Sequence, residues 1–264
     1  MRRFCVSRSS TPARIATLLI LALIAACHAP VRKPLPWAQS RQMILVITPD
    51  WNAAQASMQA FERGASGWQA QGEASPVSIG RKGTAWGIGL HPPQPGLQKR
   101  EGDGRSPAGV FALGTAFGAA AALHSAWPYA PMSADHWCID VVGSPWYDRI
   151  VDARTIGSAA VVGSSEPMRR DLHLQGDPRY MLGVVVDDNP QHEQGAGSCI
   201  FLHLWRRPGE PTAGCTAMSA ADMEALLAWL RPGDAPVFVL LPRSEYQRLH
   251  RVWNLPDITP QDLP

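Results

Sequence analysis

The sequence predicts a mainly β domain, sandwich-like or closed into a barrel. Three observations support this fold class. Short apolar runs of strand length recur along the chain. Glycine and proline are frequent, 23 and 24 of 264 residues, and clusters of turn formers separate the runs. Only one segment has the clear pattern of a long amphipathic helix. Many short strands with few helices are typical of packed or closed sheets.

The composition indicates a folded domain without a nucleic-acid partner. Hydrophobic residues make up 45% and charged residues 17%, so the chain can bury a sizeable core. The formal charge of +2 is too small for the electrostatic footprint of a nucleic-acid binder. The ten tryptophans fit either core positions or the lining of a groove.

The first 26 residues have the layout of a secretory signal. Residues 1–14 carry four arginines and no acid, and residues 15–26 are almost entirely apolar but too few to span a bilayer. Small residues directly before Cys27 resemble a bacterial lipobox. We therefore expect cleavage before Cys27, its acylation, and a mature protein tethered in the periplasm by a lipid anchor. The residue after Cys27 is His28 and not aspartate. In Gram-negative lipoproteins this resembles the pattern of an outer-membrane destination.

The elements of the exported part are expected in a simple order. Residues 27–42 contain three prolines and predict a tether. Residues 43–242 form the domain, and residues 243–264 have little apolar periodicity and predict a peripheral tail. Residues 53–63 have a helical pattern. Predicted strands span residues 43–48, 77–79, 86–90, 109–113, 138–142, 180–186, 199–205 and 237–241.

The clear helix is expected over residues 219–230. Ser219 suits the N-cap position, with Asp222 three residues on. Arg-Pro-Gly at residues 231–233 ends it. Its apolar side chains fall on one stripe: Met223, Leu226, Leu227 and Leu230.

The segment 199–205 alternates between two kinds of side chain. As a strand, it turns its even-numbered aliphatic residues to the core and its odd-numbered residues to the opposite face. That second face places His203 between Phe201 and Trp205. An imidazole between two aromatic rings suits the wall of a cleft.

A turn-rich segment follows and leads to Cys215, so the chain can double back toward His203. Gly214 leaves room for a substrate carbonyl beside the sulfur. If the helix at residue 219 points its N-terminus at the sulfur, its dipole favours the thiolate. These residues fit a thiol nucleophile with an adjacent base. On the residues alone, a buried free cysteine and a buried structural histidine stay open as alternatives.

Three segments together resemble the L,D-transpeptidase (YkuD-type) catalytic domain family. The first runs from Ser198 to Met218, with His203 after an apolar strand and then Thr-Ala-Gly-Cys. The second is Glu-Gly-Asp-Gly-Arg-Ser-Pro-Ala-Gly-Val-Phe at residues 101–111, and the third, weaker match covers residues 180–189. The resemblance runs over residues 101–241. It implies a mainly β, sandwich-like catalytic domain that acts on peptidoglycan stem peptides.

The resemblance implies a role for each site residue. Cys215 is the nucleophile that forms the acyl-enzyme, His203 moves the proton, and backbone N–H groups hold the oxyanion. Apart from the resemblance, Arg206 flanks the presumed cleft and there suits a substrate carboxylate, with a solvated face as the alternative. The candidate oxyanion and substrate-binding residues are Gly214, Thr216, Trp205, Arg206 and Thr212. No metal-ligand spacing is present, so we expect no metal and no cofactor.

The sequence departs from the family's pattern at two positions. Most members have His directly before Gly-Cys and Arg or Asn two residues after the cysteine, where this chain has Ala213 and Ala217. The pattern Thr-x-Gly-Cys-x-Ala-Met resembles a divergent branch that includes hydrolytic members. Three hypotheses therefore stay open: an L,D-transpeptidase in cell-wall remodelling, a hydrolase (L,D-carboxypeptidase or amidase) with the same site, and a non-catalytic wall-binding lipoprotein.

Cysteine pairing is expected to follow from export. With Cys5 in the signal and Cys27 acylated, Cys138, Cys199 and Cys215 remain. A nucleophile must stay reduced, so Cys138 and Cys199 are the expected disulfide. Two buried free thiols are the alternative.

Overall fold

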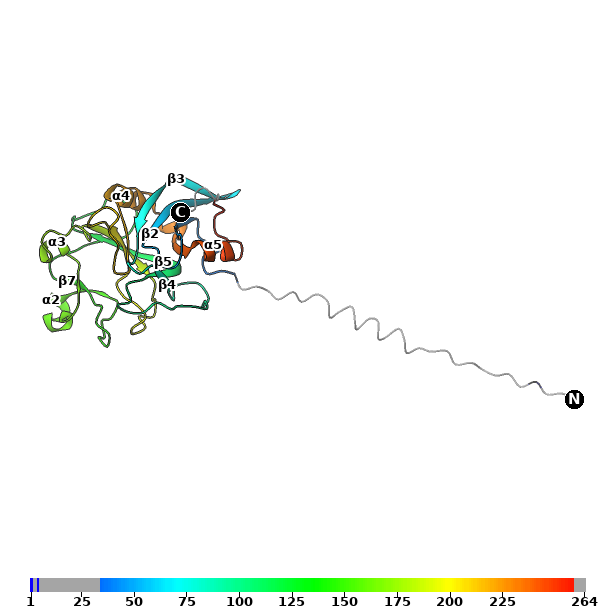
Figure 1. The fold of residues 1–264 in the computed structure, drawn as a ribbon, viewed down its shortest axis with the longest axis horizontal. Coiled ribbons are helices and arrows are strands. Elements are labelled where there is room, and N and C mark those ends of the chain that lie inside the picture. Colours follow the sequence, from blue (N-terminus) through cyan, green and yellow to red (C-terminus); the bar gives the residue numbers. More distant parts are fainter. Residues whose placement is uncertain (2–3, 5–33, 259–264) are drawn as a thin grey trace. The chain divides into compact units, whose positions relative to one another are not determined.

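The computed structural model of the chain describes residues 34–258, together with Met1 and Phe4. The chain divides into two units, Met1–Pro34 and Leu35–Pro264, and all described strands and helices belong to the second (Figure 1). The predicted signal sequence and the acylation site at Cys27 lie outside the described residues. No described helix combines the length and apolarity needed to cross a membrane.

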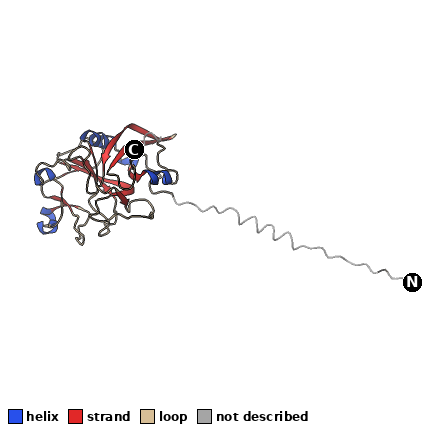
Figure 2. Ribbon diagram, in the orientation of Figure 1, coloured by secondary structure: helices blue, strands red, loops and turns tan. Residues whose placement is uncertain are grey.

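The fold is mainly β, as the sequence predicts, with 34% of the described residues in strands and 14% in helices (Figure 2). The main sheet pairs in the order β10-β11-β12-β3-β2-β1-β13-β5, and β5 also pairs with β10, so the sheet closes on itself. The join between β12 and β3 consists of one pair, Ala217 and Ser78, so most of β3 is paired only with β2. The strands are β1 (Gln42–Thr48), β2 (Gln55–Gly64), β3 (Gly67–Ser78), β4 (Thr84–Trp86), β5 (Ser106–Gly118), β6 (Tyr129–Pro131), β7 (His136–Cys138), β8 (Ile150–Asp152), β9 (Glu166–Pro167), β10 (Leu182–Asp187), β11 (Phe201–Leu204), β12 (Thr216–Met218) and β13 (Val237–Pro242).

The helices are short and lie outside this sheet order. The long predicted helix forms α4, and Ser219 caps it by accepting the Asp222 N–H at 3.0 Å. Met223, Leu226 and Leu227 are buried, which confirms the predicted stripe. The α-helices are α2 (Ala153–Ile156), α3 (Arg170–His173), α4 (Ala220–Trp229) and α5 (Arg243–Leu249), and the 3₁₀ helices are η1 (Ser158–Val161) and η2 (Pro232–Asp234).

Strand β1 confirms the prediction for residues 43–48. All of its residues are buried: β2 and the parallel strand β13 pair with its two edges, and the side chains of residues 43–47 belong to the large core. A strand covered on both faces needs apolar residues throughout, which is why the run is continuous.

The helix predicted over residues 53–63 is wrong, because this segment forms β2. It pairs with β1 on one side and with β3 on the other. Ala56, Met58 and Phe61 supply its buried side chains. Alanine, glutamine and methionine favour helices in isolation, but pairing on both sides outweighs that weak preference.

Both ends of the domain reach beyond the predicted limits of 43 and 242. Trp37, expected in the tether, is 1% exposed and donates its indole N–H to the Trp253 carbonyl at 2.9 Å. Trp253, expected in a peripheral tail, is 2% exposed and stacks on His91. The tail therefore packs into the core through α5 and the residues after it. Single large aromatics in irregular chain carry no periodic signal, so the sequence pattern missed them.

Residues 133–181 form a cover beside the main sheet. Their strands make a separate sheet in the order β8-β7-β9, and α2 and α3 lie beside β7 (Figure 1). The domain has two hydrophobic cores. The large core includes residues 43–47 of β1, residues 237–241 of β13 and the buried side chains of α4. The small core lies between the cover and the main sheet. The small core consists of Phe117, Met132, Cys138, Met168, Tyr180, Cys199, Phe201 and Cys215.

Candidate active site

Parallel pairing of β11 and β12 brings Cys215 and His203 to one face of the sheet. His203 lies opposite Ala217, and Cys215 precedes Ala217 by two residues. Because residues two apart in extended chain share a face, the thiol and the imidazole face the same side. The predicted alternation of β11 is also confirmed: Ile200 and Leu202 belong to the large core, and the opposite face belongs to the small core.

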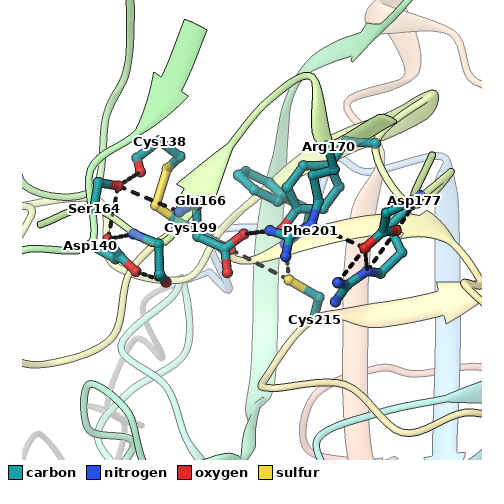
Figure 3. A network of polar contacts seen from close by, with 12 residues as sticks. Cys138, Asp140, Ser164, Glu166, Arg170, Asp177, Cys199, Phe201 and Cys215 are labelled. Carbon is teal, nitrogen blue, oxygen red and sulfur yellow. Dashed lines mark hydrogen bonds and ion pairs between the residues drawn. A yellow bond between two sulfur atoms is a disulfide. The ribbon is translucent and has the colours of Figure 1, made fainter. Parts of the chain in front are cut away.

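The Cys215 thiol is buried and held by backbone groups. Its residue is 8% exposed. The Phe201 N–H donates to the sulfur at 3.3 Å, and the thiol donates to the Cys199 carbonyl at 3.4 Å (Figure 3). Burial, with the Glu166 carboxylate as a second cause, raises the pKa of Cys215 to about 12. The thiol is therefore protonated at neutral pH, and attack on a carbonyl needs a base.

His203 is a suitable base in its neutral form. Its Nδ1 lies 2.7 Å from the Leu204 carbonyl oxygen. A carbonyl only accepts, so Nδ1 carries the hydrogen and Nε2 keeps a free lone pair. Burial lowers the pKa of His203 to about 4, so the imidazole is neutral at physiological pH. Within residues 34–258 no hydrogen bond joins the imidazole to the thiol.

The aromatic neighbours of His203 differ from the prediction. The Tyr180 ring packs edge-on against His203 at 5.4 Å and against Phe201 at 5.3 Å between centroids. Trp205 instead donates its indole N–H to Ser78 at 2.9 Å, on the β3 side. The prediction of Trp205 beside the imidazole is therefore wrong, because β11 ends at Leu204 and the face alternation stops there.

The turn before Cys215 is held by its own hydroxyl groups. Thr212 Oγ1 accepts the Gly214 N–H at 3.1 Å and donates to the Cys215 carbonyl at 2.6 Å. Ser106, from the second family-like segment, donates to the same carbonyl at 3.2 Å. The two segments thus meet at the nucleophile. Thr212 shapes the loop, and the Gly214 N–H is already bonded and not free for an oxyanion.

Gly214 serves close packing of the chain. A Cβ at this position would lie 3.0 Å from the Arg105 carbonyl oxygen and 3.3 Å from Ile200 Cδ1. Both distances are tighter than ordinary side-chain contacts. The missing side chain therefore makes room for the protein itself, whereas the sequence predicted room for a substrate carbonyl.

Thr216 pairs with Leu202, a residue of the large core, so its side chain faces away from the sulfur. Its backbone N–H stays a predicted oxyanion donor. The helix α4 begins at Ala220, with β12 between it and Cys215, and the groups that hydrogen-bond the sulfur belong to Phe201 and Cys199. An effect of the helix dipole on the thiol stays a prediction.

Arg206 belongs to a different cavity from the thiol. It pairs with Glu210 and lines, together with Arg179 and Arg207, a cavity of about 450 Å³. Cys215 is not among the residues that line this cavity. The structure therefore does not bring Arg206 to the nucleophile.

A disulfide joins Cys138 of β7 to Cys199, with their Cα atoms 5.9 Å apart. Beside it lies a second cavity of about 450 Å³, with Phe117, Met132 and Asp148 in its lining. Its lining also includes Cys199 and Phe201, the two residues whose backbone groups hold the thiol. Cys215 itself is not in the lining, so this cavity is linked to the thiol through the backbone of these two residues.

Sequence reasoning missed three residues of the cover, of which Arg170 and Tyr180 are buried and Glu166 is partly buried. Glu166, Arg170 and Tyr180 are joined by hydrogen bonds and lie beside the small core. In the sequence, Arg170 follows another arginine and has the pattern of a solvated face, and Glu166 has no signal at all. Only Tyr180 falls in a family-like segment.

The titratable groups do not gather as metal ligands. In the part of the chain that the structure describes, no three His, Cys, Asp or Glu side chains cluster. His192 pairs with Asp148 at 3.1 Å, and His173 Nε2 lies 2.9 Å from the Ala134 carbonyl.

A model of the L,D-transpeptidase catalytic domain family matches residues 50–239. A search of curated proteins found no match. Two solved structures are similar. Bd1075 of Bdellovibrio bacteriovorus is 15% identical with a TM-score of 0.36, over 81% of this chain and 56% of that chain. Pgp2, the helical cell shape determining protein of Campylobacter jejuni, is 12% identical with a TM-score of 0.36, over 77% and 48%. The chain spans about half the length of each.

Proposed function

The chain belongs to the L,D-transpeptidase catalytic domain family, and on that basis we propose that it is a cysteine-dependent acyltransferase of peptidoglycan stem peptides. One observation carries the proposal. The buried Cys215 thiol shares a sheet face with a neutral His203 that has a free Nε2 lone pair. These two groups are the minimum for nucleophilic thiol catalysis.

The proposed reaction has two steps. Cys215 Sγ attacks a stem-peptide carbonyl while its proton passes to His203 Nε2, and the leaving amine takes that proton as the thioester forms. An acceptor amine then attacks the thioester, and the thiol is restored. The Cys215 N–H is the proposed oxyanion donor, with the Thr216 N–H as second candidate, since the Gly214 N–H is engaged.

Substrate is proposed to enter through the cavity beside the disulfide. The apolar lining from Phe117, Met132 and Phe201 suits the aliphatic part of a peptide, and Asp148 suits an amine. In this proposal Arg206 does not contact the reacting groups. From its own cavity it binds a carboxylate on a part of the substrate far from Cys215.

Mass spectrometry tests the proposed nucleophile. The protein is incubated with a carbapenem, whose opened ring adds its whole mass to an acylating thiol. We expect one adduct on Cys215 in the wild type and none in Cys215→Ser. Product formation from purified muropeptides should disappear in the same variant. Labelling that persists in Cys215→Ser would contradict the assignment.

Hydrolysis is the second candidate, because Ala213 and Ala217 replace the residues that most transpeptidases of the family carry. Incubation with muropeptides in H₂¹⁸O separates the two reactions. Transfer gives a cross-linked product without the label, whereas water attack on the thioester places one ¹⁸O in the new carboxylate. Wall binding unchanged in Cys215→Ala, with no product from the wild type, would favour the non-catalytic alternative.

We further propose that the protein acts in the periplasm, anchored at Cys27 to the outer membrane. The support is the arginine-rich, apolar, small-residue layout of residues 1–27. A tether at the membrane holds the enzyme near the wall that it modifies.

A further inference from the structure

Glu166, Arg170 and Tyr180 form a hydrogen-bonded network in the cover, in which the Glu166 side chain is 20% exposed. Arg170 donates to the Glu166 carboxylate at 2.5 Å, and the Tyr180 hydroxyl donates to the same oxygen at 2.6 Å. The Arg170 side chain is 8% exposed, and Tyr180 is 4% exposed. Buried charges of this kind persist only when they are paired and hydrogen-bonded.

The network reaches the proposed nucleophile through direct packing. The Arg170 guanidinium lies 5.0 Å above the Tyr180 ring. The Tyr180 ring contacts Phe201, whose backbone N–H donates to the Cys215 sulfur. Figure 3 shows Glu166 and Arg170 meeting beside Cys215. Both charges act on the sulfur: Glu166 raises the pKa of Cys215 and Arg170 lowers it.

The charged groups around the sulfur come from several elements. The charges of Glu166 and of Asp188, which directly follows β10, disfavour the thiolate. The charge of Arg170 favours it. His203 is neutral. The position two residues after the nucleophile is Ala217, so the cysteine motif itself brings no cation.

Other arginines near the site are already committed. Arg179 pairs with Asp177 at 2.5 Å, and that carboxylate lies 3.6 Å from the Arg170 guanidinium. Arg169 pairs with Asp171 at 2.8 Å and is partly exposed. Arg170 is also paired, with Glu166, but it is the arginine that lies over the Tyr180 ring and whose charge lowers the pKa of Cys215.

We propose that Arg170 and Glu166 form a charge-balancing pair that sets the reactivity of Cys215. Glu166 holds Tyr180 and Arg170 in place but disfavours the thiolate, and Arg170 offsets that charge. Both are positioning residues and touch no substrate. The proposal rests on Cys215 being the nucleophile, and it adds the source of its electrostatic control.

The proposal predicts opposite effects from two single variants. Glu166→Gln keeps a hydrogen-bond acceptor and removes the negative charge, so alkylation of Cys215 should accelerate by roughly tenfold or more. Arg170→Met leaves the carboxylate unbalanced, so alkylation should slow by a similar factor. The double variant should return toward the wild type.

The assay follows iodoacetamide reacting with the oxidised full-length protein between pH 6 and pH 10. Labelling is read by mass spectrometry on the Cys215 peptide, since Cys138 and Cys199 are bridged. Arg169→Met is the matched control, because it removes a neighbouring arginine that pairs elsewhere, and it should leave the profile unchanged. Arg170→Lys keeps the charge and should stay within about threefold of the wild type.

Two outcomes would overturn the proposal: both single variants shift the profile in the same direction, as general loosening would cause, or neither shifts it. If Arg170→Met does not fold, Glu166→Gln and Arg170→Lys decide, and a Glu166→Gln rate at or below the wild type overturns it. Alkylation needs no turnover, so this result is separate from the proposed function. If the variants leave the alkylation profile unchanged, carbapenem labelling of Cys215 still supports the proposed function. If the protein shows no turnover, the alkylation rates of the variants can still be compared.

Discussion

Removal of the Cys138–Cys199 disulfide should lower the free energy of unfolding by about 4 kcal/mol. The bond joins residues separated by 61 positions. In the chain-entropy model, closing a loop of this length removes roughly 14 cal/mol/K from the unfolded state, or about 4 kcal/mol at 25 °C. The variant is Cys138→Ala/Cys199→Ala, because both cysteines are buried and serine would bury unpaired hydroxyls.

The same variant should also disturb the site. The bond ties β7 of the cover to the residue whose carbonyl accepts the Cys215 thiol. Without it, the cover and the thiol are held by packing and hydrogen bonds alone, so carbapenem labelling should slow. Reduction of the wild type gives the matched control, and it should reproduce most of the stability loss without a substitution.

Urea unfolding followed by tryptophan fluorescence measures the loss of stability. Non-reducing peptide mapping of protein isolated from the periplasm establishes that the bond is present before the comparison. A loss below about 1 kcal/mol would refute the loop-closure reasoning. Full alkylation of Cys138 and Cys199 without reductant, or a bridge to Cys215, would refute the pairing itself.

Three further predictions concern the base, the tail and the anchor. His203→Ala should lower kcat/KM by about 10²–10⁴-fold, the loss expected for a general base. Near-normal turnover in His203→Ala would point to another base. Because the pKa of His203 is lowered to about 4, wild-type kcat/KM should persist down to about pH 5 and decrease at lower pH as the imidazolium forms. Trp253→Ala should lower the urea-measured stability by about 3–5 kcal/mol, since a buried aromatic is lost; a negligible loss would show that the tail is dispensable. Cys27→Ala should leave the protein unlipidated and free of the membrane fraction, and an intact wild-type mass without lipid would contradict the anchor.

The fold class and the central elements were predictable because their signals are local and periodic. A continuous apolar run predicts the buried strand β1, and an apolar stripe that follows an N-cap residue predicts the helix α4. Strand β2 was not predictable in this way. Its residues prefer a helix in isolation, and only pairing with β1 and β3 makes it a strand.

The sequence by itself determined which residues are the candidate nucleophile and base. Cys215 and His203 stand out by their turn, their alternation and their resemblance to a family motif, and the parallel pairing of β11 and β12 brings them to one face. Tertiary structure alone decided their environment. The thiol is buried, and its partners are backbone groups of Cys199 and Phe201.

The charges around the thiol were also beyond the sequence. Arg170 has the same local pattern as a solvated arginine, and it is buried only because the cover folds over the small core. Glu166 and Tyr180 meet it there from other positions in the chain. Electrostatic control depends on distance and burial, which are set by packing between segments far apart in sequence, so no local pattern encodes it.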